Sequence, residues 1–111
     1  MIISRTPLRM SFVGGGSDLP DFYRRHGGAV VSTAIDKYVY VTVNKKFDNA
    51  IRIAYSKTEE VDGVHRVEHR LVRAALNHLG LLGGIEVTTM ADIPSRGTGL
   101  GSSSAFTVAL L

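Results

Sequence analysis

The 111-residue chain contains no cysteine, which excludes disulfide bonds and metal sites built on thiolates. It has no apolar run approaching the roughly 20 residues that a bilayer-spanning helix needs, and its N-terminus lacks the pattern of a signal peptide. Internal repeats and low-complexity tracts are also missing. These absences favour one soluble, cytoplasmic domain, large enough to bury a core without cross-links.

The excess of positive charge is small, with 13 Lys and Arg against 10 Asp and Glu and a net charge of +3. Such a surface suits an anionic small molecule or a nucleic acid, and equally an ordinary solvated protein. The basic residues are scattered, and no interleaving of aromatic and basic residues occurs. A nucleic-acid-binding module therefore remains an alternative that salt-dependent binding would support.

Alternating or apolar stretches predict several extended segments. The segment 29–35 is apolar enough for a buried strand, whereas residues 59–63 are expected to form a polar connection. The expected extended segments are residues 1–13, 29–35, 38–44, 51–55 and 85–89.

A short helix is predicted over residues 19–26. Asp18 is a suitable N-cap for it, Pro20 falls in its first turn, and Gly27 follows its end.

The clearest helical periodicity covers residues 64–79, with Asp62 available as a cap and Gly80 as a stop. Residues 105–111 resemble the first two turns of another helix. This order of elements predicts an α+β domain with a mixed β-sheet and helices on at least one face.

The stretch IPSRGTGLGSSSAF lies between the last predicted strand and the last predicted helix, with glycines at 97, 99 and 101. Glycines allow the backbone to approach a ligand, and the first N–H groups of a helix favour anions. Ser102, Ser103 and Ser104 add hydroxyl groups. The spacing of the glycines matches neither the Walker loop nor the dinucleotide fingerprint. Two interpretations of this stretch therefore remain open, a phosphate-binding loop and a simple tight turn.

Three stretches of the sequence resemble motifs of a known protein family. Pro94 with the following GTGLGSSSA is similar to the ATP phosphate loop of the GHMP kinases, although the stretch between Pro94 and Gly99 is one residue longer than in many members. Arg96 is a candidate for that extra residue. TPLRMSFVGGGSD, from Thr6, resembles the family's first motif, and AIDKYV, from Ala34, resembles the strand after it.

The resemblance implies a ribosomal protein S5 domain 2-like fold and transfer of phosphate from Mg²⁺-bound ATP to a small molecule. It implies that Arg9 is catalytic and lies beside the reacting hydroxyl, and that Ser103 is the metal ligand. The implied sugar-binding residues are Gly15, Gly16, Ser17 and Asp18. The implied ATP-binding residues are Gly97, Thr98, Gly99, Leu100, Gly101, Ser102, Ser103 and Ser104.

Within the family, the motifs are most similar to those of sugar kinases that act on the anomeric hydroxyl of D-glycero-D-manno-heptose 7-phosphate. Fucokinase-like and galactokinase-like members are the alternatives. The resemblance also implies that residues 1–111 form the N-terminal part of a longer enzyme, with the catalytic base in a further domain. Alone, this part is expected to be a poor kinase.

A rival interpretation comes from His65, Glu68 and His69, which fit the His-x-x-Glu-His pattern of some zinc proteases. On a helix, the two imidazoles would share a face and bind zinc, with the glutamate as base. No third ligand is evident nearby.

Overall fold

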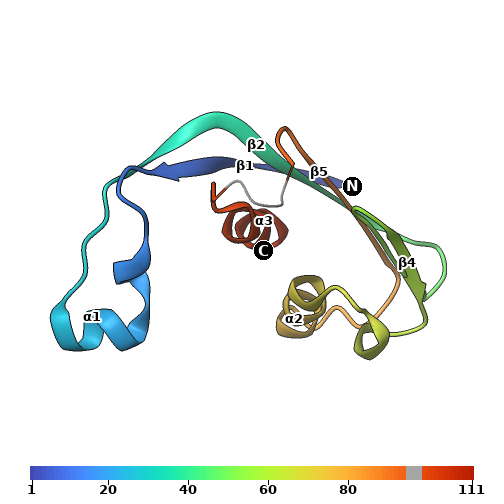
Figure 1. Cartoon of the computed structure of the whole chain (residues 1–111). Helices are drawn as coiled ribbons and strands as arrows, with labels where there is room; N and C mark the ends of the chain where they lie inside the picture. The colour runs from blue at the N-terminus through green and yellow to red at the C-terminus, as the bar shows by residue number, and fades with distance from the viewer. Residues whose placement is uncertain (95–98) are drawn as a thin grey trace.

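The computed structural model describes residues 1–94 and 99–111, which form a five-stranded sheet with helices against one face (Figure 1). The sheet order is β1-β2-β5-β3-β4; β3 and β5 are parallel, and the other neighbouring pairs are antiparallel. This arrangement confirms the predicted α+β class with a mixed sheet. The strands are β1 (Ile2–Ser11), β2 (Ser32–Lys45), β3 (Ile51–Ala54), β4 (Thr58–Val61) and β5 (Ile85–Ala91).

In the described part of the chain, three α-helices accompany the sheet: α1 (Pro20–His26), α2 (Arg70–His78) and α3 (Ser102–Leu110). Helix α3 packs on β1 and β2 and touches α2. Between α2, α3 and the sheet lies one apolar core, formed by alternate residues of the strands and one face of each of these two helices. The largest fully buried side chains are Leu8, Ile51, Ile53, Leu76, Val41, Val67, Val72 and Val87. None of the described helices is long and apolar enough to cross a membrane.

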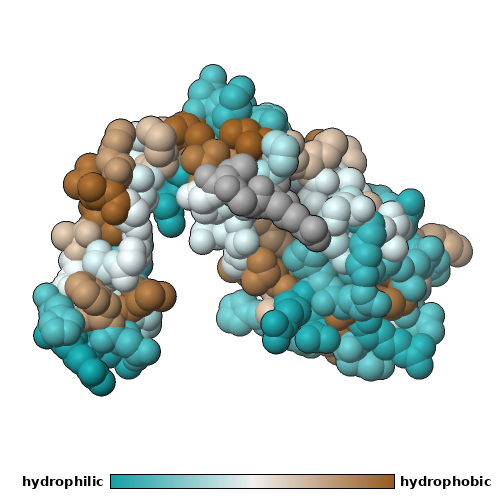
Figure 2. All heavy atoms as spheres, in the orientation of Figure 1, coloured by the Kyte–Doolittle hydropathy of each residue, from teal (hydrophilic) through white to brown (hydrophobic). Residues whose placement is uncertain are grey.

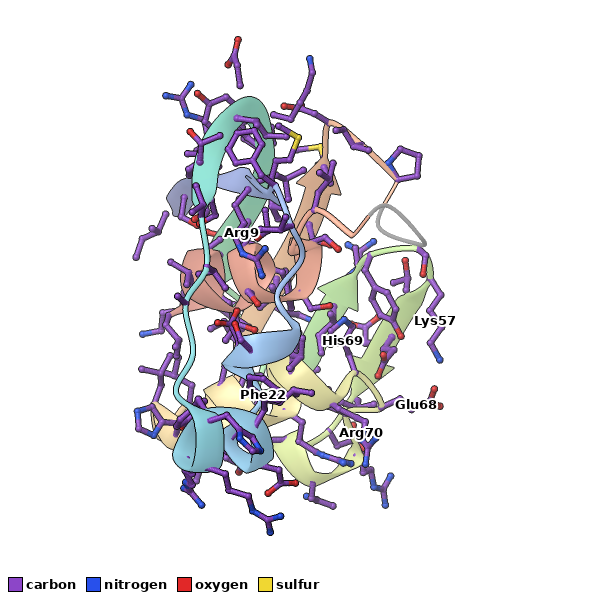
Figure 3. All side chains as sticks on the ribbon, turned by 60° about the vertical axis from the view of Figure 1, so that its left-hand side comes forward. Arg9, Phe22, Lys57, Glu68, His69 and Arg70 are labelled. Carbon is purple, nitrogen blue, oxygen red and sulfur yellow. The ribbon has the colours of Figure 1, made fainter. Side chains whose placement is uncertain are left out.

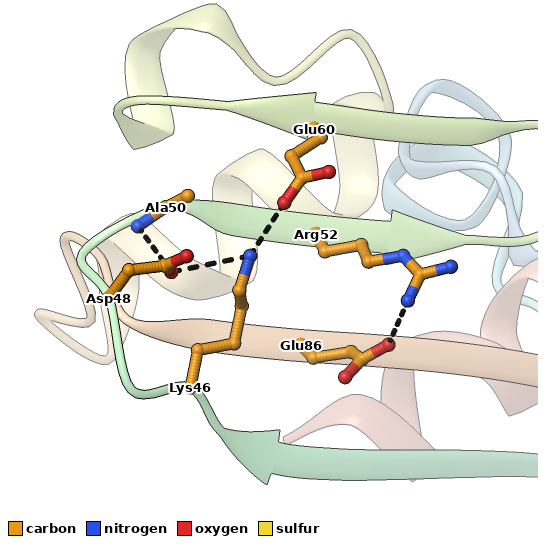
Figure 4. A network of polar contacts seen from close by, with 6 residues as sticks. All are labelled: Lys46, Asp48, Ala50, Arg52, Glu60 and Glu86. Atoms are coloured by element: carbon orange, nitrogen blue, oxygen red, sulfur yellow. Dashed lines mark hydrogen bonds and ion pairs between the residues drawn. The ribbon is translucent and has the colours of Figure 1, made fainter.

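The outer face of the sheet carries charged pairs (Figure 4). Lys46, just after β2, donates to Glu60 of β4 at 2.7 Å, and Arg52 of β3 donates to Glu86 of β5 at 3.0 Å. Because alternate strand residues point to opposite faces, this polar face follows directly from the apolar face beneath it. Such exposed pairs favour the register but contribute little to stability.

Residues 12–31 extend away from the rest of the molecule and are called the arm (Figures 1 and 2). The arm contains a 3₁₀ turn, Gly16–Asp18, followed by α1, and neither has a buried residue. Figure 2 shows an open hollow between the arm and the remainder, which is called the body.

Two expectations about strands were wrong. Residues 29–35 do not form a buried strand: β2 begins at Ser32, and Val30 and Val31 are exposed because no helix covers this end of the sheet. Residues 59–63 are not a simple connection, since β4 pairs along β3. Its polar sequence fits an edge strand, and Glu59 is buried there with hydrogen-bond partners.

The expected helix over residues 64–79 is shorter. A 3₁₀ turn spans Val64–Arg66, and α2 begins only at Arg70 with His69 as its N-cap, so Asp62 does not cap it. The N–H of Glu68 donates to the buried Glu59 carboxylate at 2.7 Å, which holds this segment out of the helix.

The other helix ends also differ in detail. Leu19, rather than Asp18, is the N-cap of α1, because Asp18 belongs to the preceding 3₁₀ turn. The predicted position of Pro20 in the first turn of α1, the Gly27 stop and the glycine after α2 are confirmed. Helix α3 begins at Ser102, earlier than the expected residue 105.

Candidate functional site

Arg9 lies where β1 meets the glycine loop. Its N–H donates to the carbonyl of Leu100 at 3.2 Å, and its guanidinium donates to the Ser11 hydroxyl at 2.7 Å. A Cβ at Gly101 would lie 3.2 Å from Arg9 Cγ and 3.5 Å from its Cζ. The Arg9 side chain therefore rests directly on the backbone at the start of α3.

The local register explains how Arg9 reaches this position. β1 pairs regularly with β2 up to Pro7 and Tyr38, and pairing resumes at Arg9 and Ala34. Such an irregularity re-aims the side chains that follow it. Leu8, at the irregularity, is fully buried, and Arg9 lies at the sheet end that adjoins α3.

The start of α3 has the features of an anion site. Gly99 and Gly101 both have positive φ, at 66° and 69°, which is a conformation that glycine adopts without strain. Gly101 is the N-cap and, as a glycine, has no side chain with which to cap the helix. Ser102, Ser103 and Ser104 form its first turn, so their backbone N–H groups lie at the positive end of the helix dipole.

The predictions for Gly97 and Thr98, and for an extra residue at Arg96, fall outside the described residues. The predicted order of strand, glycine loop and helix is confirmed by β5 and α3. The structure also places Leu100 partly buried against the core, which anchors the end of the loop.

A hollow of about 510 Å³ opens beside the first turn of α3. Ser102 and Ser103 stand at one side of it, and the rest is formed mostly by apolar and aromatic residues of the sheet, of α2 and α3, and of the segments that follow β3 and β5. Among the described residues, its lining is Val39, Tyr55, Ser56, His69, Leu71, Thr89, Met90, Ala91, Ile93, Pro94, Ser102, Ser103 and Phe106.

Three rings form one wall of this hollow. The His69 ring lies edge-on to Tyr55, with centroids 4.7 Å apart, and 5.2 Å from the ring of Phe106 on α3. This group could not be predicted from the sequence, because its members are far apart in the chain and no periodicity connects them. The rings link the residue after β3, the N-cap of α2 and helix α3 around the hollow.

The buried Glu59 carboxylate supports that wall. Burial alone would raise the pKa of Glu59, but hydrogen bonds from the Tyr55 hydroxyl and the Glu68 N–H, with the charge of Lys57, lower the pKa below its ordinary value. Burial raises the pKa of the Tyr55 phenol, and the Glu59 hydrogen bond adds to that effect. Glu59 is therefore ionised and Tyr55 neutral at neutral pH.

The predicted sugar-binding residues lie in the arm. Asp18 closes the 3₁₀ turn, with its N–H donating to the Gly15 carbonyl at 3.0 Å. A Cβ at Gly15 would lie 3.1 Å from the Asp18 carboxylate, so a side chain there would press on the Asp18 side chain. Ser17 and Asp18 line a separate hollow of about 330 Å³ together with Tyr23, Gly28, Ala29 and Val30.

The zinc interpretation was wrong. His65 lies in the 3₁₀ turn, whereas His69 caps α2 with its Nδ1 accepting from the Val72 N–H at 3.4 Å, so the two do not share a helix face. Glu68 pairs with Lys57, as Figure 3 shows. Within residues 1–94 and 99–111, no three metal-binding side chains come together.

The comparisons with known proteins agree with this geometry. Residues 64–111 match the family model described as the GHMP kinases N terminal domain, a range that includes α2, β5 and the glycine loop. The structure of a D-glycero-D-manno-heptose 1-phosphate kinase from B. thetaiotaomicron superimposes over 100% of this chain and 40% of its own, with a TM-score of 0.85 and 28% identity.

The resemblance to the GHMP kinases is confirmed.

Two further relatives show how much of each protein the resemblance to the GHMP kinases covers. The D-glycero-alpha-D-manno-heptose 7-phosphate kinase of Campylobacter jejuni is 26% identical over 99% of this chain and 36% of its own length. Lactococcus lactis galactokinase has the same fold, with a TM-score of 0.69 at 19% identity, over 97% of this chain and 31% of its own. The chain thus spans well under half of these relatives.

Proposed function

We propose that this chain forms the N-terminal GHMP kinase domain, residues 1–111, of an enzyme that transfers the γ-phosphate of ATP to a sugar hydroxyl. The observation that carries the proposal is the contact of Arg9 with Gly101 at the N-terminus of α3. A guanidinium and a set of helix N–H groups converge there, and both favour phosphate oxygens.

The reaction needs mainly positioning and positive charge. The sugar oxygen bonds to the γ-phosphorus while the bond from that phosphorus to the β–γ bridging oxygen breaks, and the hydroxyl proton passes to a base. Arg9 would stabilise the attacking oxygen and the charge on the transferring group. The base is proposed to lie in a further domain, as the resemblance implies.

The hollow beside Ser102 and Ser103 is suited to the rest of the nucleotide. Its apolar and aromatic lining matches a flat heterocycle, while the helix start and Arg9 match the phosphates. Loop residues 97–104 would hold the triphosphate; of these, Gly101 is the N-cap of α3, and Ser102 to Ser104 form its first turn.

Mg²⁺ fits this donor set in part. The exposed Ser103 lies in the first turn of α3, next to the place proposed for phosphate, and its hydroxyl is a hard oxygen ligand. The remaining ligands would be phosphate oxygens, water and groups outside this chain. The ion, when bound, would neutralise charge on the phosphates.

The sugar is proposed to be a heptose phosphate, with its anomeric hydroxyl as acceptor. The names of the B. thetaiotaomicron and Campylobacter relatives support a heptose phosphate, and those of the galactokinase and of a bifunctional fucokinase/GDP-fucose pyrophosphorylase from Arabidopsis thaliana supply the alternatives. Asp18 would accept hydrogen bonds from sugar hydroxyls, with Gly15, Gly16 and Ser17 forming the turn that presents it.

A coupled ADP-release assay on the full-length gene product tests the proposal. D-glycero-D-manno-heptose 7-phosphate, fucose and galactose are offered separately with Mg²⁺ and ATP. Turnover of about 1–10³ s⁻¹ with the heptose is expected. Preference for fucose or galactose would correct the substrate, and no turnover with any sugar would contradict the kinase assignment.

The metal role is tested by Ser103→Ala in the same protein. We expect kcat to fall by roughly tenfold or more, together with a higher Mg²⁺ requirement. Thr107→Val is the matched control, because it removes a hydroxyl one turn along α3 that donates to the Ser103 carbonyl at 2.9 Å. Unchanged Mg²⁺ dependence in Ser103→Ala would exclude the ligand role.

A further inference from the structure

Gly28 lies at an unusually close approach of two arm segments. A Cβ at this position would lie 2.5 Å from the Ser17 carbonyl oxygen and 3.1 Å from the Tyr23 Cβ. Real Cβ atoms are not found 2.5 Å from a backbone oxygen, so any side chain at position 28 would displace residue 17. The requirement is steric, since the φ of Gly28 is not in the left-handed region.

A hydrogen bond holds the same two segments from the other side. The Ser17 hydroxyl donates to the Ala29 carbonyl at 2.8 Å. The Phe12 N–H donates to the Val31 carbonyl at 3.0 Å and closes the base of the arm. The 3₁₀ turn and α1 contain no buried side chain, so backbone proximity and these hydrogen bonds, rather than a core, set the position of the turn.

The turn fixed in this way carries Asp18. Ser17 and Gly28 both line the smaller hollow, on whose wall Asp18 also lies. A shift of the Ser17 carbonyl would move Asp18, the next residue along the chain. Small displacements of a recognition group have large effects on ligand binding.

We infer that Gly28 is a positioning residue for sugar recognition, acting through Ser17 on Asp18. This inference rests on the proposed function and extends it to a residue that has no side chain with which to bind the sugar. Its signature is a loss of sugar affinity, with nucleotide binding and the folding of the body unaffected.

The test compares Gly28→Ala with Gly83→Ala in the full-length gene product. Gly83 is a matched control, because its Cβ would lie 2.6 Å from the Asn49 carbonyl oxygen, a similar clash between two loops of the body. We expect Gly28→Ala to raise the KM for heptose 7-phosphate about tenfold, with kcat, the KM for ATP and Tm close to those of the parent protein. Gly83→Ala should lower Tm and leave the sugar KM unchanged.

An unchanged sugar KM in Gly28→Ala, an equal loss for both substrates, or failure to fold would each overturn the inference. Amide hydrogen exchange of Asp18 and Leu19 gives a readout that needs no activity. We expect faster exchange there in Gly28→Ala and no change in Gly83→Ala. If the parent protein phosphorylates no sugar, the proposed function fails, and the exchange data still decide whether Gly28 fixes the turn.

Discussion

The body and the arm are built on different principles. In the body, Ile53 and Val87 are completely inaccessible to solvent and pack under α2 and α3. In the arm, Phe22 and Tyr23 remain 47% and 43% exposed. Stability is therefore concentrated in the body, while the arm holds its shape through close backbone contacts and hydrogen bonds. Figure 3 shows Arg9 at the body's α3 and Phe22 out on the arm.

This contrast predicts which substitutions should change stability and which should change ligand recognition. Removing buried atoms costs the lost transfer free energy and leaves a cavity, which applies to the body alone. Changes in the arm should alter recognition of a ligand and leave unfolding nearly unaffected. Arg9 lies in the body near its junction with the arm, because it is close to the end of β1 and touches the loop that precedes α3.

The largest effect is expected from truncating the core. Ile53→Ala should lower the free energy of unfolding by about 2–5 kcal/mol. Phe22→Ala, on the arm, should change it by only about 0.5 kcal/mol. Urea denaturation of both variants measures the difference. Equal losses would show that the arm is part of the same cooperative core and would break the comparison.

Arg9→Ala should act on catalysis rather than on folding. We expect kcat to fall about 10²–10³-fold, because a positive group aimed at the developing charge is lost. Arg5→Ala is the control, since Arg5 lies on the same strand with its guanidinium 4.4 Å from the Tyr38 ring centroid. Steady-state kinetics and Tm are measured for both, and a kcat close to the parent value in Arg9→Ala would remove its proposed role.

Glu59 makes the stability of the body depend on pH in the acid range. The pKa of Glu59 is lowered from its ordinary value of 4.5, so the unfolded chain takes up a proton first as pH falls. Its stabilising contribution is present above pH 4.5 and is lost as pH falls through the lower folded value.

Glu59→Gln should therefore reduce stability at pH 7 by about 1–3 kcal/mol and flatten the decline below pH 4.5. Glu60→Gln, at the exposed neighbouring position on β4, should leave the unfolding free energy nearly unchanged. Denaturation curves between pH 3 and 7 provide the measurement. An unaltered acid slope in Glu59→Gln would assign the acid sensitivity to other carboxyls.

The smallest expected effect concerns Asp18. Asp18→Asn should raise the sugar KM about tenfold while the KM for ATP stays near the parent value, because an amide accepts with one oxygen only. Asp21→Asn, in the first turn of α1, is the control. Equal changes for both substrates would mean that Asp18 supports the arm and does not recognise the sugar.

Local chemistry explains which elements could be predicted. Strand alternation around Val39 and Val41, and the Pro20 and Gly27 boundaries of α1, depend on residues next to one another in sequence. The start of α2 could not be predicted, because the Glu68 N–H is bonded to Glu59 of another element. The sequence of β4 likewise predicted a polar connection. Its pairing with β3 and the burial of its Glu59 carboxylate arise only when the chain folds.

Three features could be predicted from the sequence alone: the α+β class, the glycine loop before a helix, and two motifs that resemble those of the GHMP kinases. These features depend on short-range periodicity, on glycine conformations and on contiguous residue types. Three sets of contacts are visible only in the tertiary structure. Arg9 rests on Gly101, and Gly28 contacts Ser17. One wall of the larger hollow is formed by the rings of Tyr55, His69 and Phe106. Each of these contacts joins residues distant in the chain, and strand pairing and core packing bring them together.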